Sequence, residues 1–134
     1  MSDEMIITFP GGRRVDAEHG GFTVRTDQPA SNGGEGTAPS PFHLFLASLG
    51  TCAGLYALSF CAQRGIPTDG MKVVQRVVPR PGGGVGTIAV EIRVPPSFPE
   101  KYLNAITLAA SSCAVKKAIE NPPAFEVTAV VTAP

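Results

Sequence analysis

Three cysteines, Cys52, Cys61 and Cys113, are the side chains of this sequence best suited to chemistry. The thiolate is the reactive form, and an ordinary thiol, with a pKa of about 8.5, is only slightly ionised at neutral pH. A fast cysteine therefore needs a positive charge beside it. The sequence offers several cations without indicating which one reaches a cysteine: Arg13, Arg14, Arg25, Lys116 and Lys117.

A free cysteine is also among the most frequently buried residues and often serves only as a small hydrophobic side chain. Cys61, between Phe60 and Ala62, fits this packing role best. Cys52 lies on a more polar helix face that includes Ser48. Residue types alone therefore leave both roles open for Cys52 and Cys113.

The three cysteines do not form a disulfide framework, and their spacing is not that of a zinc site. The chain has only two histidines, His19 and His43. We therefore expect no metal and no cofactor. Three unpaired cysteines and an N-terminus without the pattern of a secretory signal favour the reducing cytoplasm.

Length and composition favour one globular domain over residues 1–134. Hydrophobic residues make up 43% of the chain and charged residues 16%, and eleven basic residues balance eleven acidic ones. A neutral chain has no general electrostatic attraction to nucleic acid or to an anionic membrane. We therefore expect neither of these partners.

Hydrophobic patterning and turn residues predict an α+β fold. Ser40 and Pro41 form an N-cap and first-turn pair for a helix that continues to about Arg64. Ser97 and Glu100 have the spacing of a capping box for a second helix, to about Glu120. Strands are expected at residues 5–9, 13–17, 21–26, 72–78, 87–94 and 125–131, with a loop over 28–40.

The first of these helices is apolar on all sides over residues 42–62. Its length approaches the ~20 residues of a membrane span, but it is rich in small residues and has no flanking basic clusters. Gly50 and Gly54 would allow another backbone to approach closely. We expect a buried core helix, which a small domain can cover more fully as a homodimer.

Residues 33–41 form a Gly-rich loop that ends in Ser40-Pro41, and a helix follows with the pattern L-x-x-A-x-x-x-x-C from Leu44 to Cys52. Cys113 lies in a second motif, residues 112–118. Together with Gly11-Gly12-Arg13, which is similar to an N-terminal G-G-R motif, these segments resemble the OsmC/Ohr family. The order of strands and helices agrees over nearly the whole chain.

The resemblance implies an intertwined homodimer with two long buried helices in each subunit. It also implies a peroxidase that reduces organic hydroperoxides, in which Cys52 becomes a sulfenic acid, Cys113 resolves it to a disulfide, and an external thiol reduces that disulfide. Arg13 would hold the Cys52 thiolate. An apolar substrate pocket is expected from Phe42, Phe45 and Leu49.

The sequence departs from the family pattern at two positions. The peroxidases of this family open the helix with Pro-Glu, and that glutamate orients the arginine; here the pair is Pro41-Phe42. Glu35 in the loop is a candidate substitute. The proline that usually follows the second cysteine is Ala114. These changes leave two alternatives open, namely a redox module that binds persulfides or small ligands without peroxide turnover, and a structural protein whose cysteines only pack.

Overall fold

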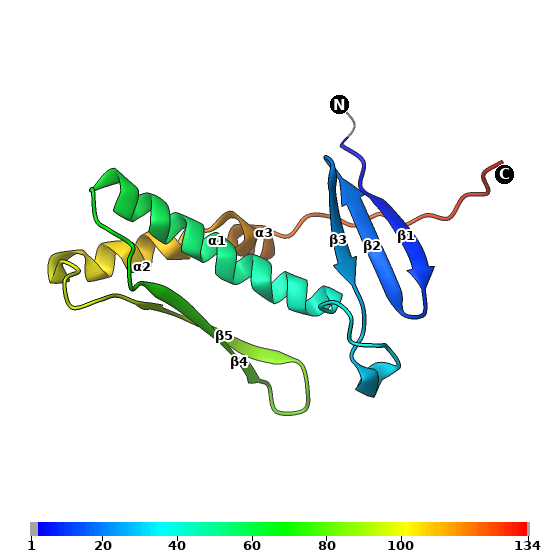
Figure 1. Ribbon diagram of the computed structural model, residues 1–134, viewed down its shortest axis with the longest axis horizontal. Helices are drawn as coiled ribbons and strands as arrows, with labels where there is room; N and C mark the ends of the chain where they lie inside the picture. The colour runs from blue at the N-terminus through cyan, green and yellow to red at the C-terminus, as the bar shows by residue number, and fades with distance from the viewer. Residues whose placement is uncertain (1–2, 134) are drawn as a thin grey trace. The chain divides into compact units, whose positions relative to one another are not determined.

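The computed structural model describes residues 3–133 (Figure 1). Their contacts divide the chain into two compact units, Met1–Ser48 and Leu49–Pro134, referred to below as the first and the second unit. Strands and helices are both present, so the predicted α+β class is confirmed.

The first unit contains a three-stranded antiparallel sheet. Its strands are β1 (Ile6–Gly11), β2 (Arg14–His19) and β3 (Phe22–Thr26), in the order β1-β2-β3. Gly20 and Gly21 connect β2 to β3, and both have positive φ angles, of 57° and 82°. A two-residue hairpin turn of this type requires such angles, which glycine adopts without steric cost.

The loop after β3 is closed by hydrogen bonds at its base. It contains the short 3₁₀ helix η1 (Ala30–Asn32), and the Asp27 N–H donates to the Pro39 carbonyl at 3.1 Å. The buried Asp27 carboxylate accepts bonds from the Gln28 N–H and from both the N–H and the hydroxyl of Thr37. These bonds, that of the Thr37 hydroxyl foremost, lower the pKa of Asp27 to about 2.

Helix α1 (Pro41–Gln63) begins where the sequence predicts, because the Ser40 hydroxyl accepts the His43 N–H at 3.3 Å. By length and composition it could cross a membrane, and 28% of its most apolar window is buried. Its small residues admit strand β4 (Lys72–Pro79): a methyl group on Gly54 would lie 3.9 Å from Val73 Cγ2, and one on Gly50 3.3 Å from Gln75 Oε1. The atoms that approach these glycines belong to side chains of β4, whereas we expected another backbone.

The core of the second unit forms between α1, the β-hairpin and the helices that follow. Strand β4 pairs antiparallel with β5 (Val85–Arg93), and the chain continues through η2 (Glu100–Tyr102), α2 (Leu103–Ser111) and α3 (Ala114–Glu120). The core cluster of buried side chains comprises Ala57, Phe60, Cys61, Phe98 and Ile106. The C-terminal part of α1 thus contributes directly to this core.

The predicted second helix is interrupted, and its predicted cap is wrong. The N-cap of η2 is Pro99, and no side chain makes a capping hydrogen bond there. Ser97 and Glu100 therefore form no capping box. The helix breaks after α2, because Cys113 is extended at φ −65° and ψ 141°. The Ser111 and Ser112 hydroxyls donate hydrogen bonds to the Thr107 and Leu108 carbonyls. Such side-chain bonds compete with the hydrogen bonds of the helix backbone and disfavour continuation of a helix.

The strand predicted at residues 125–131 is also wrong for the single chain. The segment has neither helix nor strand assignment, and Phe125 and Val127 are 84% and 93% exposed. A strand needs a neighbouring strand to satisfy its N–H and C=O groups, and the alternation of apolar residues does not supply one. The sequence pattern therefore marks a segment able to pair rather than one that is paired.

Candidate functional site

Cys52 and Cys113 come together within the second unit. Cys52 lies midway along α1 and is half-buried, whereas Cys113 occupies the break between α2 and α3 and is 2% exposed. The two side chains hydrogen-bond to each other. Both thiols are free. The structure thus brings together the two cysteines that the sequence singled out.

The break at Cys113 has a direct electrostatic effect on Cys52. It exposes the first amides of α3, and the pKa of the Cys52 thiol is lowered, chiefly by a hydrogen bond from the Val115 N–H. Burial opposes this effect, while bonds from the Cys113 side chain and the Ala114 N–H add to it. Hydrogen bonds to the charged form of an acid stabilise that form.

These backbone donors favour the Cys52 thiolate without a cation beside it in the second unit. Sequence analysis missed Ala114 and Val115 because it treated residues 97–120 as one helix, in whose interior each N–H is already bonded. A signal was present: the family's proline at position 114 is typical of the first position of a helix. In this chain Ala114 keeps the N–H that a proline would lack.

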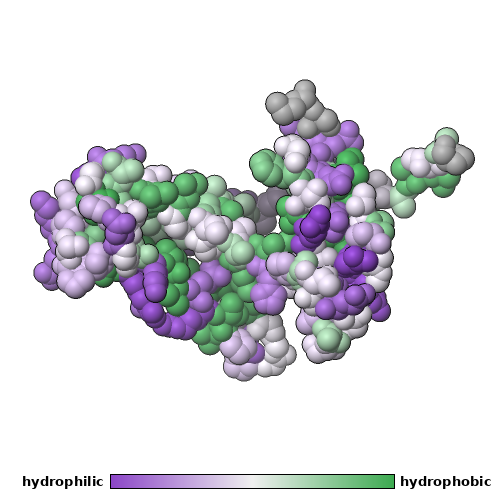
Figure 2. Space-filling view, viewed as in Figure 1, coloured by the Kyte–Doolittle hydropathy of each residue, from purple (hydrophilic) through white to green (hydrophobic). Residues whose placement is uncertain are grey.

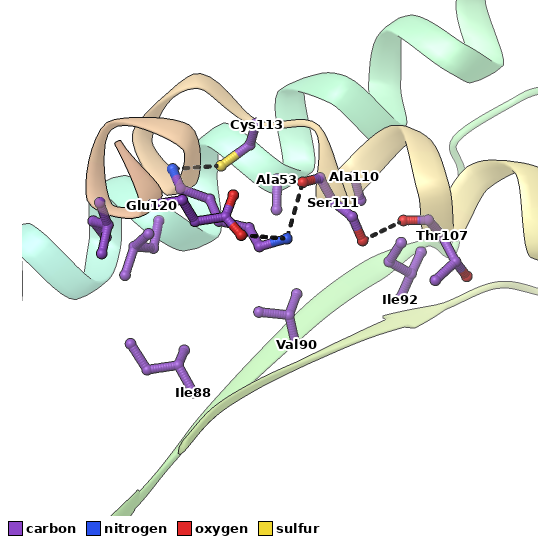
Figure 3. Close-up of a pocket in the computed structure, with 12 residues that line it drawn as sticks. Ala53, Ile88, Val90, Ile92, Thr107, Ala110, Ser111, Cys113 and Glu120 are labelled. Carbon is purple, nitrogen blue, oxygen red and sulfur yellow. Dashed lines mark hydrogen bonds and ion pairs between the residues drawn. The ribbon is translucent and has the colours of Figure 1, made fainter. Parts of the chain in front are cut away.

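Cys113 acts as the N-cap of α3. Its sulfur accepts the Lys116 N–H at 3.3 Å (Figure 3). The ammonium group of Lys116 donates to the Ser111 carbonyl at 3.3 Å and lies 3.9 Å from the Glu120 carboxylate. Lys116, one of the candidate cations, therefore bonds to Cys113 through its backbone rather than through its charge.

Cys61 has the packing role expected of it. It is completely buried, its thiol lies 3.8 Å from the Met71 sulfur, and burial raises its pKa. A buried thiol with a raised pKa has little reactive thiolate. The surroundings of Cys52 therefore favour the thiolate, and those of Cys61 oppose it.

Arg13 belongs to the first unit, whereas both cysteines belong to the second. It lies in the turn between β1 and β2 rather than in a strand. A methyl group on Gly33 would lie 3.7 Å from Arg13 Nε, and one on Gly12 would lie 3.6 Å from Glu35 Oε1. The Arg13 turn and the Glu35 loop therefore lie against each other, although no ion pair joins Arg13 to Glu35 within residues 3–133.

An open cavity of about 480 Å³ lies beside Cys113, between α1, β5, α2 and α3. Figure 3 shows Ile88, Val90 and Ile92 of β5 facing the helices across it. Leu49 lines this cavity, as the predicted apolar pocket requires. Phe42 and Phe45 do not: they belong to the first unit, where their rings lie 5.7 Å apart.

The sequence profile of the OsmC-like protein family matches residues 34–128. A search of curated protein sequences finds no match. A solved structure of a protein from Psychrobacter arcticus 273-4, provisionally named an osmotic stress induced and detoxification response protein, is similar, with a TM-score of 0.73 and 24% identity over 85% of each chain.

Two further solved structures share the fold. An organic hydroperoxide resistance protein from Legionella pneumophila has a TM-score of 0.56 and 22% identity over 87% of this chain and 88% of its own. A provisionally named organic hydroperoxide resistance protein from Vibrio cholerae, with captopril in one of its active sites, has a TM-score of 0.59 and 21% identity over 89% and 85%.

Proposed function

This chain belongs to the OsmC-like protein family, and from that premise we propose that it is a thiol-dependent peroxidase that reduces organic hydroperoxides. The observation that carries the proposal is the hydrogen-bonded pair of Cys52 and Cys113, with the α3 amides directed at Cys52. The hydroperoxide resistance proteins that share its fold support a redox role.

The cycle begins with the Cys52 thiolate. It attacks one oxygen of the hydroperoxide, the O–O bond breaks, and the alkoxide leaves and takes a proton to become an alcohol. Cys52 is then a sulfenic acid. The Cys113 sulfur attacks the Cys52 sulfur, hydroxide leaves as water, and a disulfide forms. Two external thiol groups supply two electrons and two protons to restore both cysteines, and they become a disulfide.

Arg13 is proposed to complete this site by pairing with the thiolate and with the leaving oxygen. Glu35, on the loop beside the Arg13 turn, is proposed to orient it in place of the glutamate that Phe42 replaces. The second unit alone already supplies donors to Cys52. Loss of Arg13 should therefore lower the peroxidase rate without abolishing it.

We also propose that the chain works as a cytoplasmic homodimer, without nucleic acid or membrane partners. Several large apolar side chains remain exposed, and Figure 2 shows hydrophobic surface on both units. Phe9, Phe22 and Leu108 are 80%, 77% and 70% exposed. Exposed apolar side chains gathered in large patches commonly mark association surfaces.

A second candidate function is a redox module that binds persulfides or other small ligands. The observation that favours it is Phe42 at the helix start, 52% exposed, where the family's peroxidases have glutamate. Such a module would use the same Cys52 and the same cavity. It would show thiol exchange at Cys52 without turnover of hydroperoxides.

Stopped-flow turnover of cumene hydroperoxide with a dithiol tests the proposal. We expect wild-type turnover, no turnover for Cys52→Ser, and one equivalent of alcohol followed by stalling for Cys113→Ser. Cys61→Ala is the control and should retain the wild-type rate. Turnover unchanged by Cys52→Ser would exclude the mechanism, and thiol exchange without any turnover would favour the second candidate.

A further inference from the structure

The sheet of the first unit carries charged side chains on one of its faces. Asp16 of β2 lies directly opposite Arg25 of β3 in the antiparallel ladder, so the two side chains share a face. Arg14 precedes Asp16 by two residues and lies on the same face, because side chains alternate along a strand. Val15 and Val24, at the alternate positions, help to line an apolar hollow. The apolar face is the one that a partner subunit would cover, which leaves the charged face open to solvent.

A second cavity, of about 420 Å³, lies on this charged face. A volume of this size is ordinary for a small-molecule site. The sheet contributes all three charged side chains of the wall, and the loop after β3 contributes to one side of it. The wall residues are Pro10, Arg14, Asp16, Arg25, Thr26, Thr37 and Ala38. All of them belong to the first unit, so the cavity is complete within that unit.

The charges of the wall are not balanced by the protein itself. Arg14, Arg25 and Asp16 take part in no ion pair within the described part of the chain. Two guanidinium groups and one carboxylate leave an excess of positive charge on the wall. The Asp27 carboxylate does not line the cavity, because it is buried and hydrogen-bonded within its own loop. An anion would therefore relieve the repulsion between the two arginines.

The Arg14 guanidinium is held in place by the turn that precedes β2. Its Nε donates to the Gly11 carbonyl at 3.3 Å. A methyl group on Gly11 would lie 3.0 Å from Arg14 Nη2, so the guanidinium lies against the turn. A guanidinium has further N–H donors in a fixed plane, which suit the two oxygens of a carboxylate. Arg14 is thus oriented by the fold before any ligand binds.

We propose that this cavity binds a free acidic amino acid such as glutamate. Arg14 and Arg25 each bind one carboxylate of the ligand, and Asp16 binds its ammonium group. The ligand then supplies the negative charge that the wall lacks. A simple dicarboxylate would place no cation beside Asp16, and an amino acid with a neutral side chain would leave one guanidinium unpaired. No cysteine lines this cavity, so the inference goes beyond the proposed function and does not depend on it.

Isothermal titration calorimetry of the full-length protein at low ionic strength tests the ligand class. We expect saturable binding of L-glutamate. Glutarate, which lacks the ammonium group, and L-glutamine, which lacks one carboxylate, should each bind at least about tenfold more weakly, because each loses one charge-assisted interaction. Absence of saturable glutamate binding, or equal affinities for the three ligands, would overturn the inference. The measurement involves no hydroperoxide, so a failed peroxidase proposal leaves it unaffected.

Variants of the wall test the assignment of the partners. Arg25→Gln should weaken glutamate binding at least about tenfold, whereas Arg80→Gln, which removes the same charge from an exposed residue after β4, should leave it unchanged. Asp16→Asn should weaken glutamate binding and strengthen glutarate binding, because the group that pairs with the ammonium is lost. A merely structural role of Asp16 would weaken both ligands. That result, or equal effects of the two arginine variants, would contradict the site; if a variant does not fold, the ligand comparison on the wild-type protein still decides.

Discussion

The side chain of Cys52, in the middle of α1, hydrogen-bonds to that of Cys113, at the break between α2 and α3. The same break directs the first amides of α3 at Cys52. One local interruption of a helix therefore provides both the partner of the reactive cysteine and the donors that favour its thiolate.

Removal of one amide donor should raise the pKa of Cys52. Ala114→Pro deletes the N–H at the first position of α3, where proline otherwise fits well. The midpoint of the pH profile for alkylation by iodoacetamide should move to higher pH, because less thiolate exists at a given pH. Ala114→Gly keeps the N–H and serves as the control. Identical profiles for both variants would show that this amide does not act on Cys52.

Acid should destabilise the first unit through Asp27. Its pKa of about 2 in the folded chain lies below the ~3.9 of an unfolded aspartate. Its contribution to stability is therefore complete above about pH 4 and is lost as the pH falls toward 2. Thermal unfolding across this range should show a smaller decline for Asp27→Asn than for wild type. Asp69→Asn, in an exposed turn of the second unit, is the control; an equal effect there would refute the assignment.

Gly34 should tolerate no side chain. A methyl group at this position would overlap with the Gln28 backbone carbonyl, whose oxygen also accepts a hydrogen bond from the Gly36 N–H. Gly34→Ala should lower the free energy of unfolding by about 3 kcal/mol or more. Gly54→Ala, which meets only ordinary contact in α1, should be neutral or stabilise by up to about 1 kcal/mol. Similar stabilities for the two variants in urea denaturation would contradict this account of the loop.

The chain should sediment at twice its mass of 13.9 kDa at micromolar concentration. The reason is the amount of apolar surface that the single chain leaves exposed, on α1 as well as on the sheet of the first unit. Leu55→Glu, at a 56% exposed position of α1, should weaken association if α1 contributes to the interface. A monomer for the wild-type protein would exclude the homodimer.

Local signals predicted α1 well, because Ser40 caps it and Gly65 follows its end. The break at Cys113 had no comparable signal in this chain, because Ala114 stands where the family has the proline that is typical of a helix start. Residues 125–131 have an alternating pattern that is necessary for a strand, but pairing depends on a neighbour that a pattern does not specify.

The candidate site was also predicted only in part. The residue types of Cys52 and Cys113 and the family resemblance were enough to select the pair, and burial of Cys61 agrees with its exclusion. The α3 amides were missed because backbone donors carry no signature of their own in a sequence. Their direction depends on where a helix starts, and here that start lies within a segment whose composition favours a continuous helix.

The most direct test is peptide mapping of the reduced protein after one equivalent of cumene hydroperoxide. The account predicts a single intramolecular Cys52–Cys113 disulfide, one equivalent of alcohol, and a free Cys61 thiol. Three free thiols with the hydroperoxide unconsumed, or a disulfide that involves Cys61, would contradict it.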